Sequence, residues 1–228
     1  LHFGVSSNVP NGQWGDLQSY PFIWEAYVNQ YKPKVIACAR PHIISVVEQE
    51  VELNGDLSWS ACGKITDYEW TCSNGKVVHG ARAKIVYDKP GYYSEILKVT
   101  DAQGNVSFDT AQVEVFDDAM VNKPVKSTFD FPASIHLTYA PTCDIKVGDL
   151  ITFKVRTFRT KEGGETIDFG DGSPKVQVKS DGNAKKLDPN GYAACTHAFA
   201  KPGTYCVRAD HVNSNGLKAT THVFVTVK

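Results

Sequence analysis

The sequence has a single methionine and no apolar run long enough to cross a membrane. It also has no block of one charge, since 24 basic and 25 acidic residues leave a net charge of −1. A protein that binds nucleic acid or an anionic membrane surface usually shows a basic patch. We therefore expect neither a nucleic-acid partner nor membrane insertion.

The short motifs that mark common catalytic centres are also missing. The sequence has no Gly-x-Ser-x-Gly elbow, no His-Glu-x-x-His helix, no phosphate-binding loop and no Cys-x-x-Cys pair. Its seven histidines are dispersed and form no recognisable constellation. We expect that this fragment is not an enzyme and needs no cofactor, although a missing upstream portion could be catalytic.

Two turn-forming stretches organise the second half of the chain. Residues 166–173 read Thr-Ile-Asp-Phe-Gly-Asp-Gly-Ser, in which a strand meets a sharp turn. Glycine adopts backbone angles that other residues resist, and aspartate caps such a turn through its side chain. Residues 197–205 then predict a short strand, a Pro-Gly turn and a new strand.

The same signals occur upstream. Lys89-Pro90-Gly91 matches Lys201-Pro202-Gly203, and two later signals follow at the same interval, which is typical of an internal repeat. The first copy has Thr71 and Asn74 where the second has its two turn aspartates. A role that needs two carboxylates is therefore not expected in the first copy. The second copy carries an insertion, residues 174–194, and binding is often found on such loops.

These motifs resemble those of the polycystic-kidney-disease (PKD) repeat, an immunoglobulin-like β-sandwich. The resemblance implies an all-β fold class with two such sandwiches in tandem, preceded by a short N-terminal segment with one helix. The expected parts are the N-terminal segment at 1–42, the first sandwich at 43–116, a linker at 117–130 and the second sandwich at 131–228. The linker is long enough for hinge motion unless Met120, Val121 and Phe129 pack at the junction.

The N-terminal segment has no counterpart in the repeat. Ser19 and Pro33 bound a predicted aromatic helix at residues 21–31. Two interpretations stay open: the segment is the end of a missing upstream domain, or it is a local extension packed on the first sandwich. The absence of an initial Met and of a signal peptide indicates a processed or excised piece.

A small set of residues is a candidate for ligand contact. Trp59 lies in a connection, where it could stack on a sugar or cover the aromatic helix. The candidates for binding are Trp14, Trp59, Lys175, Lys185 and Lys186. Asp168 and Asp171 offer oxygen ligands to a hard cation, and some PKD repeats carry calcium. The alternative is that Asp171 only bonds its own turn.

The six cysteines allow disulfides without proving them. A Cys62–Cys72 bridge would close a short loop, and Cys195 and Cys206 bracket the Pro-Gly turn. An immunoglobulin-like sandwich can place the latter two in opposite sheets, beyond bridging distance. Cys38 and Cys143 are expected to be unpaired. The alternative is that all six are small buried apolar residues.

The resemblance implies a function that the residues alone do not determine. We expect an extracellular, non-catalytic accessory module, a spacer and weak binder of polysaccharide, in a larger secreted or surface hydrolase. The alternative is a cell-surface adhesion module that binds another protein. In either case we expect a monomer located outside the cell or on its surface.

The repeat alignment makes a prediction about stability. Trp70 occupies the core position of the third strand, whereas Trp59 lies in a connection. Truncating a buried aromatic residue to alanine costs about 3–5 kcal/mol. Trp70→Ala should therefore lower the urea midpoint far more than Trp59→Ala, and equal shifts for the two variants would contradict the alignment.

Overall fold

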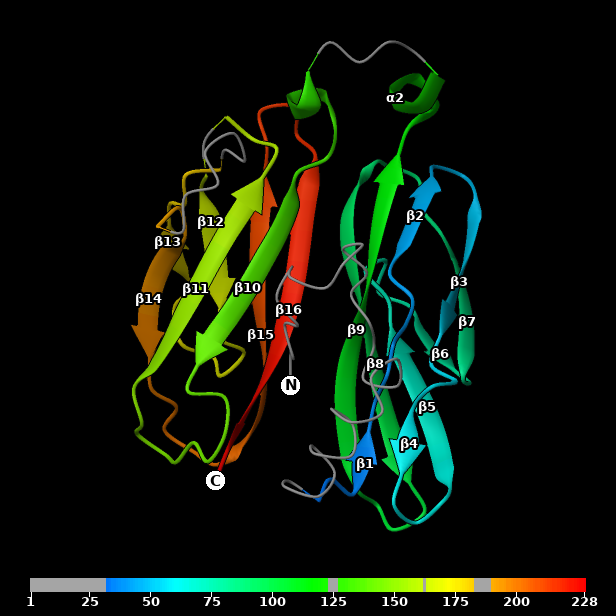
Figure 1. The fold of residues 1–228 in the computed structure, drawn as a ribbon, viewed down its shortest axis with the longest axis vertical. Helices are drawn as coiled ribbons and strands as arrows, with labels where there is room; N and C mark the ends of the chain where they lie inside the picture. Colours follow the sequence, from blue (N-terminus) through cyan, green and yellow to red (C-terminus); the bar gives the residue numbers. More distant parts are fainter. Residues whose placement is uncertain (1–31, 123–126, 162, 183–189) are drawn as a thin grey trace, which may run out of the picture.

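The computed structural model describes residues 32–122, 127–161, 163–182 and 190–228. Figure 1 shows two β-sandwiches side by side, connected at one end by a segment with the short helix α2 (Asp118–Asn122) and the 3-10 turn η2 (Thr128–Asp130). The predicted all-β fold class is confirmed. The helix predicted at residues 21–31 lies outside the described residues.

The first sandwich is built from nine strands. Its larger sheet has the order β6-β5-β8-β9-β2, and the β3-β7 pair and the short β1-β4 pair complete it. The strands are β1 (Val35–Ile36), β2 (Ile43–Val46), β3 (Glu50–Asn54), β4 (Trp59–Ser60), β5 (Ile65–Thr71), β6 (Val77–His79), β7 (Arg82–Val86), β8 (Gly91–Asp101) and β9 (Val106–Phe116).

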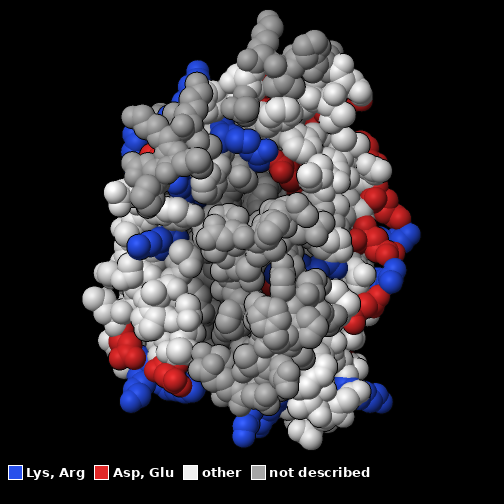
Figure 2. Space-filling model, in the orientation of Figure 1, with Lys and Arg blue, Asp and Glu red and all other residues white. Residues whose placement is uncertain are grey.

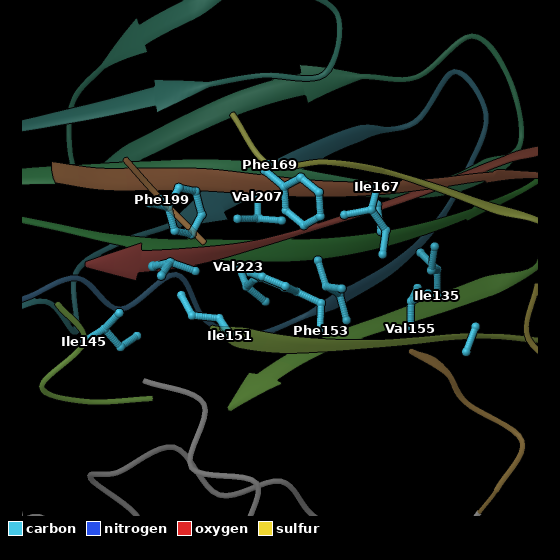
Figure 3. Close-up of a cluster of buried hydrophobic side chains, with 14 of the residues drawn as sticks. Ile135, Ile145, Ile151, Phe153, Val155, Ile167, Phe169, Phe199, Val207 and Val223 are labelled. Carbon is cyan, nitrogen blue, oxygen red and sulfur yellow. The ribbon is translucent and has the colours of Figure 1, made fainter. Parts of the chain in front are cut away.

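The second sandwich packs the sheet β10-β11-β14 against β13-β12-β15-β16. Its strands are β10 (Ser134–Ala140), β11 (Ile151–Phe158), β12 (Glu165–Asp168), β13 (Val176–Val178), β14 (Ala193–His197), β15 (Gly203–Val212) and β16 (Lys218–Val227). Side chains alternate between the two faces of a strand, and every second residue therefore points inward. Figure 3 shows the resulting core, in which Phe153 and Phe169 have ring centroids 5.2 Å apart.

Strand register confirms the repeat alignment. Trp70 pairs with Leu97 in the first sandwich, and Ile167 pairs with Ala209 in the second. Leu97 and Ala209 are separated by the same interval as the two Lys-Pro-Gly motifs. Trp70 and Ile167 are both fully buried, each in its own core. They occupy equivalent positions, as the shared turn signals predicted.

Each copy also closes its Pro-Gly turn with the same hydrogen bond. The Tyr93 hydroxyl donates to the Lys89 carbonyl at 2.8 Å. The Tyr205 hydroxyl donates to the Lys201 carbonyl, also at 2.8 Å. The repeated motif therefore encodes a specific local contact and not only a turn.

The first core extends into the predicted N-terminal segment. Val35, Ala37 and Ala39 are buried with the first-sandwich residues. The Ala37 and Ala39 amides donate to side chains at the start of β9, Ser107 and Asp109. Within the described residues, this part of the chain packs as an integral piece of the first sandwich.

None of the six cysteines, all of which the structure describes, forms a disulfide, and the two expected bridges are therefore not present. Cys72 is buried in the first core, whereas the Cys62 thiol lies 3.1 Å from the Ser60 hydroxyl in a turn. Cys195 is on β14 and Cys206 is on β15, strands of opposite sheets. The sandwich topology thus places Cys195 and Cys206 in opposite sheets, which is the arrangement that immunoglobulin-like sandwiches allow for this pair.

The two sandwiches touch directly, which the linker composition did not predict. Strand β16 pairs in parallel with β8, Lys218 lying opposite Gly91 and Ala219 opposite Tyr92, so that one nine-stranded sheet spans both sandwiches. A Cβ on Gly91 would lie 2.9 Å from the Lys218 carbonyl oxygen, and only glycine permits this approach without a shift. Tyr92 packs against the second core.

Aromatic and charged contacts add to this joint. Phe108 of β9 stacks on Phe224 of β16 with ring centroids 4.9 Å apart. The Arg159 guanidinium binds the Glu114 carboxylate across the joint. Val121, one of the three linker residues whose packing at the junction would have prevented hinge motion, is 57% exposed. The strand pairing and the aromatic stack, which come from β8, β9 and β16, therefore restrain the two sandwiches.

The joint yields a testable prediction. Stacked aromatic pairs contribute about 0.5–1.5 kcal/mol beyond their buried area. A double-mutant cycle of Phe108→Ala and Phe224→Ala, measured by urea unfolding, should therefore give a coupling of about 1 kcal/mol. The control cycle, Phe108→Ala with Phe199→Ala, joins two rings with no shared contact and should be additive. Additivity in the first cycle would show that the stack does not couple the sandwiches.

Candidate functional site

Asp168, the last residue of β12, and Asp171, in the turn that follows, are the two aspartates predicted as cation ligands. Asp168 Oδ1 accepts the Gly170 amide at 3.0 Å, and Oδ2 lies 3.2 Å from Lys175 Nζ. Asp171 Oδ1 accepts the Ser173 amide at 3.0 Å. Both carboxylates therefore shape the turn from within.

His197 completes the arrangement from the opposite sheet. Its Nε2 lies 2.7 Å from Asp171 Oδ2. Its ring stacks on Phe169 at a centroid distance of 3.9 Å and meets Phe199 edge-on at 4.7 Å. Because His197 is on β14 and the turn follows β12, this pair ties the two sheets of the second sandwich together.

The pKa shifts of Asp168 and Asp171 agree with a structural role for both carboxylates in the turn. Desolvation acts to raise the pKa of Asp171, but hydrogen bonds from Ser173 and the contact with His197 outweigh it and lower the pKa to about 2. The Gly170 amide and Lys175 hold the pKa of Asp168 below its usual value, against some desolvation. Both groups are stabilised as carboxylates by protein donors.

All four carboxylate oxygens of the turn have protein partners. A hard cation requires several oxygen ligands at once. Calcium at this turn would have to displace Lys175 and His197 from their contacts. The geometry favours the alternative reading, in which the aspartates bond their own turn.

Of the candidates for ligand binding, the structure describes Trp59 and Lys175, and these two lie in different sandwiches. Trp59 is half-buried on β4, opposite Ile36 of β1, in the first sandwich. Lys175 precedes β13 in the second sandwich and pairs with Asp168. Figure 1 shows β4 and β13 in different sandwiches. Trp14, Lys185 and Lys186 lie outside the described residues.

Sequence reasoning missed a polar and aromatic cluster on the outer face of the β10-β11-β14 sheet. The buried Arg156 makes a two-pronged ion pair with Asp181 at 2.8 and 2.7 Å. Its guanidinium lies 5.6 Å from the centroid of the Tyr192 ring, and the Tyr192 hydroxyl lies 3.1 Å from His136 Nδ1. Asp181 and Tyr192 belong to the insertion that the sequence marked, but their partners come from β10 and β11.

Gly191 makes this cluster possible. A Cβ at this position would lie 2.5 Å from Arg156 Cζ and 2.4 Å from Asp181 Oδ2. A glycine beside a tyrosine in a long insertion was the available signal, but nothing in the sequence placed Arg156 under it. The Arg156 guanidinium also lies 5.3 Å from the centroid of the Phe158 ring. We name Arg156, His136, Phe158 and Tyr192 the outer-face cluster.

Charge is mixed along one edge of the first sandwich. Figure 2 shows acidic and basic side chains intermingled along the edge where Figure 1 places β3 and β7. Ion pairs along this edge join Lys84 to Glu50 and Arg82 to both Glu52 and Asp56. No helix among the described residues is long and apolar enough to span a membrane.

The two immunoglobulin-like β-sandwiches define the fold class of this protein. Comparison with known proteins identifies the family of the first sandwich. Residues 32–115 match the family model of the PKD domain. This part of the chain is a PKD domain, as its turn motifs predicted. The matched range begins before residue 43, in agreement with the burial of Val35, Ala37 and Ala39 in the first core.

One curated relative covers both sandwiches. Collagenase ColA of Clostridium perfringens is 31% identical over 225 residues, a match that covers 86% of this chain and 20% of the collagenase. The chain thus spans about a fifth of the length of that relative.

Two solved structures that are similar to part of this chain are single PKD domains. The PKD1 domain of the Vibrio cholerae metalloprotease PrtV is 26% identical, covering 36% of this chain and 98% of that domain, with a TM-score of 0.32. The PKD1 domain of Vibrio anguillarum Epp is 25% identical, covering 36% of this chain and 93% of that domain, with a TM-score of 0.28.

The turn makes a prediction about pH. The folded pKa of Asp171, about 2, lies below its ordinary value of 3.8, so its stabilisation is complete above pH 3.8 and is lost as pH falls through about 2. Asp171→Asn should lower the free energy of unfolding at pH 7 by about 1 kcal/mol, a modest value because the pair is partly solvated. The deficit should close as pH falls toward 2.

Urea titrations at several pH values measure this deficit. The exposed Asp88 is a control position, and Asp88→Asn should leave stability unchanged. A deficit for Asp171→Asn that stays constant from pH 7 to pH 2 would show that the charge of Asp171 is not what stabilises the turn.

Proposed function

We propose that this chain is a non-catalytic accessory module of a larger secreted protein, and that it holds the parent on an insoluble extracellular substrate. The main support is the 31% identity to collagenase ColA across both sandwiches, together with the match of the first sandwich to the PKD family model. We propose that the functional units are the sandwiches predicted at residues 43–116 and 131–228, the first of them extended by the buried residues from Val35 to Ala39, with the linker at 117–130. We place them outside the cell or on its surface.

The side-by-side arrangement of the two sandwiches suits a wide binding surface better than it suits a long spacer between other domains. Because β16 runs parallel to β8 from Lys218 opposite Gly91, its C-terminal end lies toward the Asp101 end of β8. The amide of Ala37 is bonded to Ser107 at that same end. Figure 1 shows the C-terminus and β1 at the same end of the molecule, opposite the linker. The described chain therefore begins and ends on one side, and the sandwiches add width instead of length.

The outer-face cluster is the ligand contact that we propose. Tyrosine offers an apolar ring with a polar tip, which suits a partner that is partly apolar and partly hydroxylated, such as a polysaccharide. Arg156 is held by Asp181 beneath the cluster, so that the surface above it is pre-shaped. Loops carried on a rigid sandwich are common places for binding.

A second candidate, binding to another protein, is favoured by the name of the relative, a collagenase. On this reading the module adheres to a fibrous protein or a cell-surface protein, and sugars are not recognised. The two candidates share the accessory role and differ in the chemistry of the solid that retains the chain.

Co-sedimentation with insoluble solids tests both candidates. The purified chain is mixed with microcrystalline cellulose, chitin or insoluble collagen, and the bound fraction is measured over a range of protein concentrations. We expect saturable retention on a polysaccharide that falls at least about fivefold in Tyr192→Ala, since loss of one ring contact costs roughly 1 kcal/mol. Trp59→Ala is the comparison variant, because Trp59 lies in the other sandwich and its loss should leave retention unchanged.

Each outcome of this assay is informative. Retention on collagen alone would favour the protein-binding candidate. Retention that drops in Trp59→Ala but not in Tyr192→Ala would move the contact to the first sandwich and overturn the proposed surface. Absence of saturable retention on every solid would overturn the anchoring role.

A further inference from the structure

A group of metal-binding side chains lies on the first sandwich, away from the outer-face cluster. Asp67 and Glu69 are two residues apart on β5, and His79 lies opposite Glu69 on the edge strand β6. One ligand atom from each of the three lies within 4.8 Å of the others. We propose that Asp67, Glu69 and His79 bind a divalent transition-metal ion such as zinc, cobalt or nickel.

The fold positions all three on one face. Trp70 points into the core, so its neighbour Glu69 points outward, and Asp67 shares that outward face because side chains alternate along a strand. The Trp70 indole donates to the Gly80 carbonyl at 3.2 Å, and the Gly80 amide donates to the Tyr68 carbonyl at 2.9 Å. These two bonds fix the backbone beside His79.

The donor set selects the class of metal. Imidazole nitrogen with carboxylate oxygens suits zinc, nickel and copper, whereas calcium and magnesium prefer oxygen ligands alone. Ligands of tetrahedral zinc lie about 3.4 Å apart. His79 and Asp67 are already 3.0 Å apart, and ligand atoms separated by as much as 4.8 Å would have to approach by up to about 1.4 Å. Their exposure allows this, since His79 and Asp67 are 61% and 40% exposed.

The second copy of the repeat shows that the fold does not require these residues. Thr166 occupies the place of Glu69, because it precedes the core residue Ile167 as Glu69 precedes Trp70. Its cross-strand partner is Gln177, whose amide donates to the Thr166 hydroxyl at 2.8 Å. A neutral pair thus fills the equivalent positions, whereas the first copy has a carboxylate and an imidazole there.

Two charged or polar contacts compete with a metal at this place. His79 Nδ1 lies 3.0 Å from Asp67 Oδ1, and the Lys98 ammonium lies 3.7 Å from Glu69 Oε1. A metal would replace the first contact and push Lys98 away from Glu69. Removing the charge of Lys98 should therefore strengthen binding, which a merely structural cluster would not show.

Cobalt titration of the full chain, kept reduced and first treated with a chelator, tests the proposal. Cobalt reports its ligands through its absorption spectrum, which separates this site from the cysteines: a thiolate ligand gives an intense near-ultraviolet band. We expect one saturable site without that band. Its affinity should weaken more than about tenfold in His79→Gln, since losing a metal ligand costs over 1.4 kcal/mol. It should strengthen in Lys98→Gln.

The controls separate the site from other histidines and from unfolding. His42→Gln removes an exposed histidine beside β9, away from β5 and β6, and should leave cobalt affinity unchanged. His79→Gln introduces the residue type that the second copy carries at the equivalent position, and circular dichroism confirms that each variant is folded. Unchanged affinity in His79→Gln, a thiolate band at the tightest site, or no saturable site would each overturn the proposal.

Discussion

The close approach of Gly91 to the Lys218 carbonyl is the constraint on which the arrangement of the two sandwiches depends. Any larger residue at position 91 would place a carbon 2.9 Å from that oxygen. The parallel pairing of β8 and β16, the Phe108–Phe224 stack and the packing of Tyr92 on the second core all require the strands at this separation. The two sandwiches are thereby joined into one unit, and both ends of the described chain lie on one side of it.

Each sandwich also buries a glutamate that accepts hydrogen bonds from the start of a loop. Glu95 is fully buried and accepts the amide and hydroxyl of Ser73, both at 2.6 Å, and the hydroxyl of Tyr87 at 3.0 Å. Burial raises the pKa of Glu95, and these hydrogen bonds offset part of that effect. Glu165 accepts bonds from Thr157 and Ser180 in the second sandwich. A buried carboxylate without hydrogen-bond partners would destabilise the fold by several kcal/mol. The loops that supply those partners are therefore fixed in position.

The candidate sites illustrate where sequence reasoning succeeded and where it did not. The Asp168–Asp171 turn was located, and its structural reading follows from local geometry, because each aspartate bonds an amide two residues further on. The Arg156–Asp181 pair and its tyrosine were not found. Arg156 and Asp181 are 25 positions apart, and nothing in their local sequence indicates that they meet.

The sequence by itself determined the two sandwiches, their equivalent core positions at Trp70 and Ile167, and the tyrosine-closed turns. These features depend on the alternation of side chains along a strand, on glycine backbone angles and on contacts between residues a few positions apart. All three are determined by residues close together in the sequence. Only the tertiary structure decided the joint between the sandwiches, the separation of the cysteines and the face shared by Asp67, Glu69 and His79. These depend on which strands become neighbours, and strand pairing between distant segments is decided by packing of the whole chain.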